Sequence, residues 1–383
     1  MGRDLLVFFF CRRHDFEGFG SKVQRSSVVS LNAMVGKKLW IALAAVALWA
    51  SCDNTLDVTA PFENVPIVYC TLNPDSDTQY VRVGRAYLGQ EGPNGGSAHP
   101  DSLYYPNLLA RIQAFKENGQ LAWDKTLEVT YDTPKDSGLF TSQGHRLYRL
   151  ILPGFTSNSN RLDWDYKLIL QKDSASPVLA TAITPMVNSE SFTLKKPTPI
   201  GIQRLNMTST KGQEIEWNQA RNARAYQGYI DFLYMEMPEH QQSDSTRHTV
   251  RYRLPYQLGS TLNGGATSKT TLTYQEYYQF LAESLPIKPG YIRFFRGFTL
   301  HLTAGTDDLA TYISVTQPSN TILQDPPFYT NVQGGAGIFA STASLDRPNL
   351  GLADRSLDSL VFGKLTCSLR FAKASFLDTL TCN

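Results

Sequence analysis

The chain has 383 residues, of which 42% are hydrophobic, 11% are aromatic and 18% are charged. That apolar content is enough for one large or two ordinary domains and excludes a disordered chain. The formal charge is +2, but residues 1–51 hold seven Lys or Arg and three acids, so the remainder holds 29 basic and 31 acidic residues, a charge of −2. Nucleic-acid binding needs a concentrated basic face, so this class is excluded.

Residues 34–51 have the layout of a secretory signal. Two lysines precede an apolar run from Leu39 to Trp49, and the small residues Ala50 and Ser51 precede Cys52. The run is shorter than the roughly 20 residues of a transmembrane helix. We therefore predict a signal peptide over 34–51 and a lipid, with acyl chains such as palmitate, on Cys52. The alternative is an ordinary signal peptide and an unmodified Cys52, because Trp49 stands where bacterial lipoproteins commonly have Leu.

Residues 1–33 fit no leader, since charged residues separate their apolar run, Leu5 to Phe10, from the second one. We expect translation to begin at Met34 and residues 1–33 to be a mis-called upstream extension. After Cys52 the chain is polar as far as Pro61, so residues 52–62 are predicted to be a flexible tether.

Residues 63–195 are predicted to form a β-sandwich. Short β-rich runs recur at intervals of about ten residues, and turn signals at 73–77 and 117–119 indicate two hairpins. The expected strands are 66–72, 79–88, 109–115, 121–129, 138–140, 146–152, 166–171 and 178–184. Lys195 to Pro199 is predicted to be a stiff linker, because its two prolines disfavour helix before them.

Residues 198–383 are predicted to be a second β-rich domain. Ile215 to Trp217 followed by Tyr226 to Met235 resembles the second and third strands of a fibronectin type III domain. The aromatic stripe in these strands is predicted to be core, with a sugar-stacking platform as the alternative. The stripe comprises Trp217, Tyr226, Ile230, Phe232 and Tyr234. The predicted fold class is therefore mainly β, with two β-sandwich domains of immunoglobulin or fibronectin III type.

One short helix is predicted in the second domain. Thr273 and Glu276 form a capping box, and apolar residues recur at helical spacing until Pro286. Further strands are expected at 291–303, 311–316 and 359–371.

Three cysteines follow the predicted leader and lipid site. Cys70 and Cys367 alternate with apolar neighbours and are predicted to face the core from strands, whereas Cys382 lies in the tail. A disulfide between Cys367 and Cys382, worth about 3 kcal/mol, is one expectation, and free thiols are the other. No metal site is predicted, because no histidine after Cys52 lies three or four residues from another or from a cysteine. The histidines after Cys52 are His99, His145, His240, His248 and His301.

The remaining motifs favour structural interpretations. Gly335 to Ala340 spells G-x-G-x-x-A, but no βαβ unit surrounds it, so no dinucleotide cofactor is expected. Asn73, Asp75 and Asp77 have the spacing of calcium ligands but lack the glycine and glutamate of a calcium loop, so we expect an ordinary turn. No catalytic motif is found, and neighbouring acids such as Asp307 and Asp308 leave only a hydrolase with separated carboxylates open.

Several segments together resemble a family of Bacteroidota lipoproteins with a domain of unknown function. They are Cys52 after its leader, Pro66 to Pro74, Tyr80 to Val83, and Phe328 to Phe339. The resemblance implies an outer-membrane or periplasmic lipoprotein associated with nutrient-uptake receptors. The glycines of Gly334 to Phe339 indicate a structural corner, with a ligand-facing loop as the alternative.

These observations lead to one main functional hypothesis. We expect a lipoprotein of the cell envelope, on the periplasmic face or the surface of the outer membrane, held by lipid on Cys52. It would act as a non-enzymatic binding or accessory module for a glycan, a peptide or an envelope receptor. The alternative is an extracytoplasmic hydrolase whose two carboxylates lie about 5 to 10 Å apart in a cleft.

Overall fold

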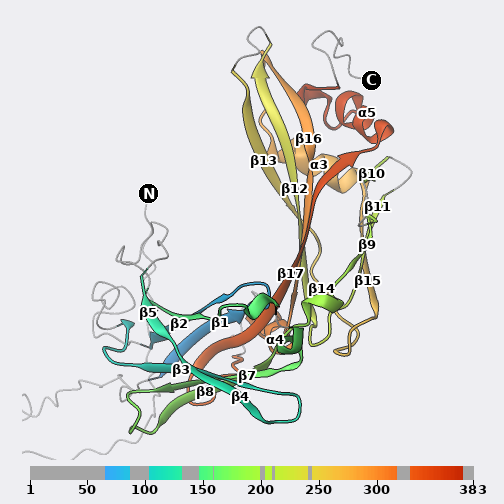
Figure 1. The fold of residues 1–383 in the computed structure, drawn as a ribbon. Coiled ribbons are helices and arrows are strands. Elements are labelled where there is room, and N and C mark those ends of the chain that lie inside the picture. The colour runs from blue at the N-terminus through green and yellow to red at the C-terminus, as the bar shows by residue number, and fades with distance from the viewer. Residues whose placement is uncertain are drawn as a thin grey trace, which may run out of the picture. The chain divides into compact units, whose positions relative to one another are not determined.

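The computed structural model describes residues 65–86, 103–131, 146–157, 159–198, 203–208, 212–239, 244–316 and 328–373. All of them belong to one compact unit, Pro61–Asn383. This unit is mainly β, with three α-helices among the described residues (Figure 1). The predicted fold class is confirmed. The predicted leader, tether and strand at 138–140, together with Cys52 and Cys382, lie outside the described residues.

The first sandwich pairs part of a large sheet with a four-stranded sheet. The large sheet runs in the order β13-β12-β16-β17-β1-β2-β6-β5, and the smaller one in the order β4-β3-β7-β8. Both predicted hairpins, β1–β2 and β3–β4, are antiparallel pairs. Facing residues such as Val68, Ile112 and Leu168 form its core. The strands are β1 (Pro66–Leu72), β2 (Thr78–Arg85), β3 (Leu109–Phe115), β4 (Leu121–Thr126), β5 (Glu128–Thr130), β6 (Leu147–Ile151), β7 (Asp165–Gln171) and β8 (Val178–Pro185).

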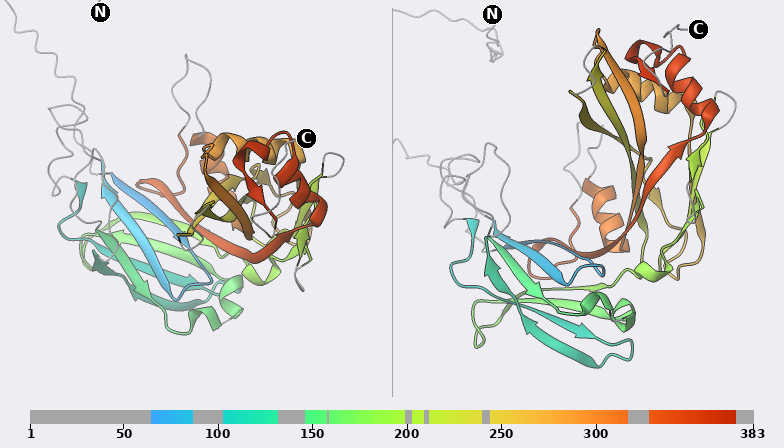
Figure 2. Two further views of the ribbon diagram at one scale, coloured as in Figure 1. Left: turned by 90° about the horizontal axis from the view of Figure 1, so that it is seen from above. Right: turned by 45° about the horizontal axis from the view of Figure 1, so that its top comes forward.

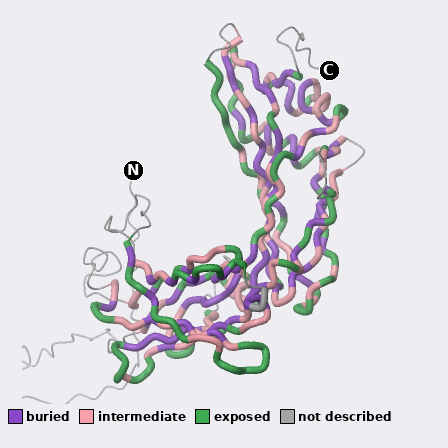
Figure 3. Tube along the Cα trace, in the orientation of Figure 1, coloured by how far each residue is buried: buried purple, intermediate pink, exposed green. Residues whose placement is uncertain are grey.

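The second sandwich packs the other half of the large sheet against β15-β11-β9 and two helices. The predicted aromatic stripe is confirmed as core, because its five members are at most 6% exposed. Buried residues recur along β12 and β16 (Figure 3). The strands are β9 (Leu194–Lys196), β10 (Arg204–Leu205), β11 (Gln213–Asn218), β12 (Ala225–Pro238), β13 (Thr246–Arg253), β14 (Gln257–Leu258), β15 (Thr267–Leu272), β16 (Tyr291–Gly305), β17 (Ala336–Leu352) and β18 (Phe371–Ala372).

Strand β17 takes part in both cores. Its first six residues pair in parallel with β1, and the residues from Thr342 to Leu350 pair antiparallel with β16. Phe339 lies in the first core, and Ala343 and Leu350 lie in the second. Figures 1 and 2 show this strand passing from one sandwich into the other. The predicted division near residues 195–198 stays a prediction, although Lys195 and Lys196 are strand residues of β9 rather than linker.

The predicted helix is α3 (Tyr274–Ser284). Its N-cap Thr273 accepts a hydrogen bond from the Glu276 amide at 3.3 Å and donates one to the Glu276 carboxylate at 2.7 Å. The first bond confirms Thr273 as the N-cap, whereas the bond to the Glu276 carboxylate comes from the Thr273 hydroxyl, where a capping box has the Thr273 backbone amide.

Two further helices replace predicted strands. The expected strand at 311–316 is part of α4 (Asp307–Thr316). The two acids in its first turn stabilise the helix through the positive charge of its N-terminus, and this helix forms despite the β-propensity of the residues that follow. The expected strand at 359–371 is α5 (Asp354–Phe362) followed by the 3-10 helix Cys367–Leu369. In α5 the buried residues are Ser356, Leu360 and Val361, which lie on one face of a helix. Packing of this face against the core therefore favours a helix over a strand in this segment.

Candidate functional site

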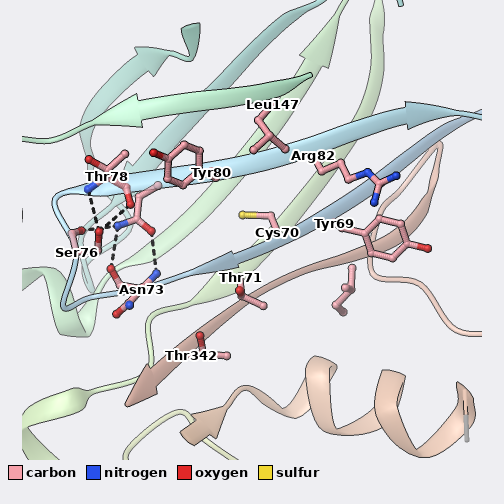
Figure 4. A pocket seen from close by; sticks show the side chains of 12 residues that line it. Tyr69, Cys70, Thr71, Asn73, Ser76, Thr78, Tyr80, Arg82, Leu147 and Thr342 are labelled. Carbon is pink, nitrogen blue, oxygen red and sulfur yellow. Dashed lines mark hydrogen bonds between the residues drawn. The ribbon is translucent and has the colours of Figure 1, made fainter. Parts of the chain in front are cut away.

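The outer face of the first sandwich carries a pocket of about 580 Å³ formed by β1, β2, β6 and β17 (Figure 4). We call it the β1–β2 pocket. It is lined by Tyr69, Cys70, Thr71, Asn73, Ser76, Thr78, Gln79, Tyr80, Arg82, Leu147, Ile338 and Thr342.

Strand alternation places the aromatic rings of this pocket. Val68, Cys70 and Leu72 turn into the core, so Tyr69 turns outward and is 44% exposed. On β2 the same alternation leaves Tyr80 40% exposed. Arg82 pairs across the strands with Tyr69 and is exposed on the same face. The inward phase of this alternation predicted the core residues, whereas the outward phase, with Tyr69 and Tyr80 on one face, is the missed signal in the sequence for this site.

Hydrogen bonds between side chains and backbone groups hold the turn at the end of the pocket. The Gln79 side-chain amide donates to the carbonyls of Asn73 at 2.8 Å and Ser76 at 2.6 Å, and its oxygen accepts from the Asn73 amide. The Asn73 side-chain oxygen accepts from the Asp75 amide at 2.8 Å. Asp77 accepts from the Thr156 amide at 2.9 Å, which lowers the pKa of that carboxyl. The polar side chains of residues 73–79 thus stabilise the turn, which agrees with the prediction of an ordinary turn.

A second pocket of about 330 Å³ lies between α4 and strands β12 and β16. We call it the α4 pocket. It is lined by Ala225, Gln227, Tyr229, Arg253, Tyr256, Thr303, Gly305, Leu309, Ile313 and Thr342. Arg253 donates to the Gln227 side-chain oxygen through two nitrogens, at 3.0 and 2.9 Å. The Tyr256 hydroxyl is buried, and no described residue forms a hydrogen bond with it.

The two pockets meet at Thr342, which lines both. The pairing of β17 explains why they meet there. β17 leaves β1 after Ser341, whose partner is Leu72, and Thr342 is its first residue paired with β16, at Gly305. Helix α4 lines the α4 pocket through Leu309 and Ile313. Its Tyr312 forms a hydrogen bond with Tyr69 of the β1–β2 pocket, and burial together with this bond raises the pKa of Tyr312.

A third pocket, of about 540 Å³, contains one carboxylate. Asp173 lines it together with Arg85 and Lys172, and accepts hydrogen bonds from the Ser176 hydroxyl and amide. These bonds lower the pKa of the Asp173 carboxyl. The hydrolase alternative requires two carboxylates in one cleft. None of the three pockets has two carboxylates among its lining residues.

Asp307 and Asp308 lie in the first turn of α4. The Tyr329 hydroxyl donates to the Asp308 carboxylate at 2.5 Å, and the Asn331 side-chain amide donates to it at 3.1 Å. Burial and this carboxylate raise the pKa of Tyr329. Asp307 faces Arg224 at 3.5 Å. Both acids therefore fasten α4 to neighbouring segments.

The described histidines bind other side chains. His248 stacks on Tyr234 with ring centroids 5.1 Å apart. His301 lies 2.8 Å from Asp346 and 3.3 Å from Asp231. Within the described residues no cluster of three His, Cys, Asp or Glu is placed to hold a metal ion. His99, His145 and His240 lie outside the described residues.

The glycine segment is a structural corner. A Cβ added to any of three of its glycines would collide with a backbone carbonyl oxygen. The distance would be 2.4 Å from Gly334 to the oxygen of Leu179, and 2.7 Å from Gly335 to the oxygen of Pro66. For Gly337 the distance to the oxygen of Val68 would be 1.9 Å. Only glycine permits such close backbone packing. The segment continues as β17 rather than as the helix that follows the glycines of a dinucleotide-binding motif.

The two described cysteines are both buried. Cys70 is a free thiol on β1, and burial raises its pKa. Cys367 is buried as predicted, but in a 3-10 helix rather than a strand. It is disulfide-bonded, and its partner lies outside the described residues, so the pairing with Cys382 stays a prediction.

Comparisons with known proteins assign no family. No family model matches the chain, and no curated protein matches it. The solved structures that resemble it include Escherichia coli α2-macroglobulin activated by trypsin, with 10% identity over 63% of this chain and 14% of that chain and a TM-score of 0.17. The same protein activated by porcine elastase has 10% identity over 76% of this chain and 20% of that chain, with a TM-score of 0.16. Red sea bream transglutaminase has 10% identity over 77% of this chain and 32% of that chain, with a TM-score of 0.15. The chain spans less than a third of each of these proteins, and at these TM-scores the likeness supports no functional conclusion.

Proposed function

We propose that the protein is an envelope lipoprotein, anchored through lipid on Cys52, that works as a non-enzymatic binding or accessory module. The β1–β2 pocket is its binding site. The observation that carries this proposal is an open pocket of about 580 Å³ with two exposed tyrosines, several neutral polar groups and no carboxylate among its described lining residues. Aromatic and neutral polar groups in a concave surface suit recognition of a glycan or a peptide.

The anchor rests on the leader sequence and on the cysteine that follows it. Among the described residues, no helix combines the length and the apolar character needed to cross a membrane. Several acyl chains on one cysteine bind a bilayer essentially permanently. The outer membrane, at its periplasmic face or its surface, is the proposed location, and an envelope receptor is a further proposed partner.

Replacing Cys52 by Ser should release the protein from the membrane pellet into the soluble fraction. The measurement is fractionation of cells that express the wild type or the variant, followed by immunoblotting. The Cys70→Ser variant is the matched control, since Cys70 is a buried core residue and its replacement should leave the protein in the pellet. A Cys52→Ser protein that still sediments with membranes contradicts the anchor.

A photocrosslinker tests the binding site in intact envelopes. Benzoylphenylalanine in place of Tyr80 is expected to capture a glycan or protein partner, because this ring is exposed within the pocket. The same residue in place of Ile287, which is 64% exposed and lines none of the three pockets, is the control. Equal adduct yields at the two positions, or no adduct at either, refute a ligand in the β1–β2 pocket.

A further inference from the structure

We propose that the β1–β2 pocket and the α4 pocket form one groove that binds an anionic oligosaccharide, with Arg82 and Arg253 each contacting an acidic group of the sugar chain. This inference rests on the proposed binding function and names its ligand class. The shared lining residue Thr342 lies between the two subsites.

The charges that line the groove are of one sign. Arg82 has no ion-pair or hydrogen-bond partner among the described residues, and Arg253 donates only to the neutral side chain of Gln227. No Asp or Glu stands among the described residues lining either pocket. A guanidinium binds carboxylate and sulfate groups through charge-assisted hydrogen bonds, so both subsites favour an anionic ligand.

The remaining lining groups suit a sugar chain. Tyr69, Tyr80 and Tyr229 supply aromatic rings, which can cover the apolar faces of pyranose rings, and Thr71, Thr303 and Thr342 supply hydroxyls. The buried Tyr256 hydroxyl needs a hydrogen-bond partner, and a sugar hydroxyl or carboxylate in the α4 pocket would supply one.

The backbone of the groove favours a sugar over an acidic peptide. Extended peptides commonly bind by adding a strand to an exposed sheet edge. Here β1 and β2 are inner strands of the sheet, as are β12 and β16, so the floor has no outer sheet edge to which a strand could add, although the β1–β2 ladder itself ends at Tyr69 and Arg82. A ligand recognised through hydroxyl and acidic groups therefore fits this floor better than one recognised through its main chain.

Calorimetry with the full-length protein in detergent tests the ligand class. The probes are oligogalacturonate, its carboxyl-reduced neutral counterpart of the same length, and a polyglutamate peptide. We expect oligogalacturonate to bind at least about tenfold more tightly than either other probe, since a hydrogen bond to a charged group is worth about one decade in Kd or more. Arg82→Gln and Arg253→Gln should each weaken this binding about tenfold.

Arg247→Gln is the matched control. Arg247 is exposed on the same strand as Arg253, six residues and thus about 20 Å away, and it lines neither pocket. Its replacement should leave Kd within twofold.

Four outcomes overturn the inference. Equal binding of the neutral oligosaccharide refutes the anionic class, tighter binding of polyglutamate assigns the site to acidic peptides, and an effect of only one arginine refutes the single groove. The fourth is failure of all three probes to bind. If the Tyr80 crosslink still captures a partner, the proposed binding function survives, and if the crosslink fails as well, both are refuted.

Discussion

Replacing Gly337 by alanine is expected to destabilise the protein by about 3 kcal/mol. Gly337 has φ +99°, in the region that costs L-residues roughly 1–2 kcal/mol. Its new Cβ would lie 1.9 Å from the Val68 carbonyl oxygen, so β17 must also move away from β1, at a further cost of about 1–3 kcal/mol. Urea unfolding should show a lower midpoint with an unchanged slope.

Gly119→Ala separates the two causes. Gly119 has φ +79°, but a Cβ there has no heavy atom within 4 Å. This variant should therefore lose only the backbone part, about 1 kcal/mol. Equal losses at the two positions would show that close packing of β17 on β1 contributes nothing.

Replacing Arg293 by methionine is expected to cost about 3–5 kcal/mol, the usual effect of breaking a buried ion pair. The Arg293 side chain is 2% exposed and its nitrogens lie 2.9 and 3.0 Å from Glu236. It also donates to the carbonyls of Leu369 at 3.0 Å and Pro286 at 2.7 Å. Burial would raise the pKa of Glu236, but bonds from Lys288 and Arg293 outweigh it and lower that pKa. The variant leaves this carboxylate with Lys288 alone.

Arg251→Met is the matched control for burial. Arg251 also pairs with a carboxylate on β12, Asp231, at 2.7 Å, but its side chain is 58% exposed. Exposed pairs contribute at most about 1 kcal/mol because water screens them. Thermal unfolding of both variants gives the comparison, and similar losses would mean that burial does not set the strength of the Arg293 pair.

Local signals predicted the elements that local chemistry determines. Alternation with a turn signal placed β1 and β3 at the residues where they lie, and the Thr273 capping box placed α3. The β-branched run at 311–316 predicted a strand, but packing beside β12 and β17 and the acids of the first turn made it α4. Tertiary contacts overrode propensity there.

The candidate site could be predicted only in part. Outward alternation at Tyr69 and Tyr80 is a signal in the sequence for two exposed rings that went unused, and it does not tell that they line one pocket with Thr342. That proximity depends on the parallel pairing of β1 with β17, strands from opposite ends of the described chain. Nor does any spacing pair Arg293 with Glu236, which are 57 residues apart. Long-range pairing, rather than local pattern, builds both features.

The shared strand β17 also sets an order of events during synthesis. Its pairing with β1 requires residues 336–341, so the first sandwich lacks an inner strand until nearly the whole chain has been made. Such distant pairing is slow, and until it forms the β1 edge is open to other chains. A newly made chain thus has to keep its N-terminal half unfinished until residues 336–341 have been made, and in that interval β1 is the strand most open to pairing with another chain.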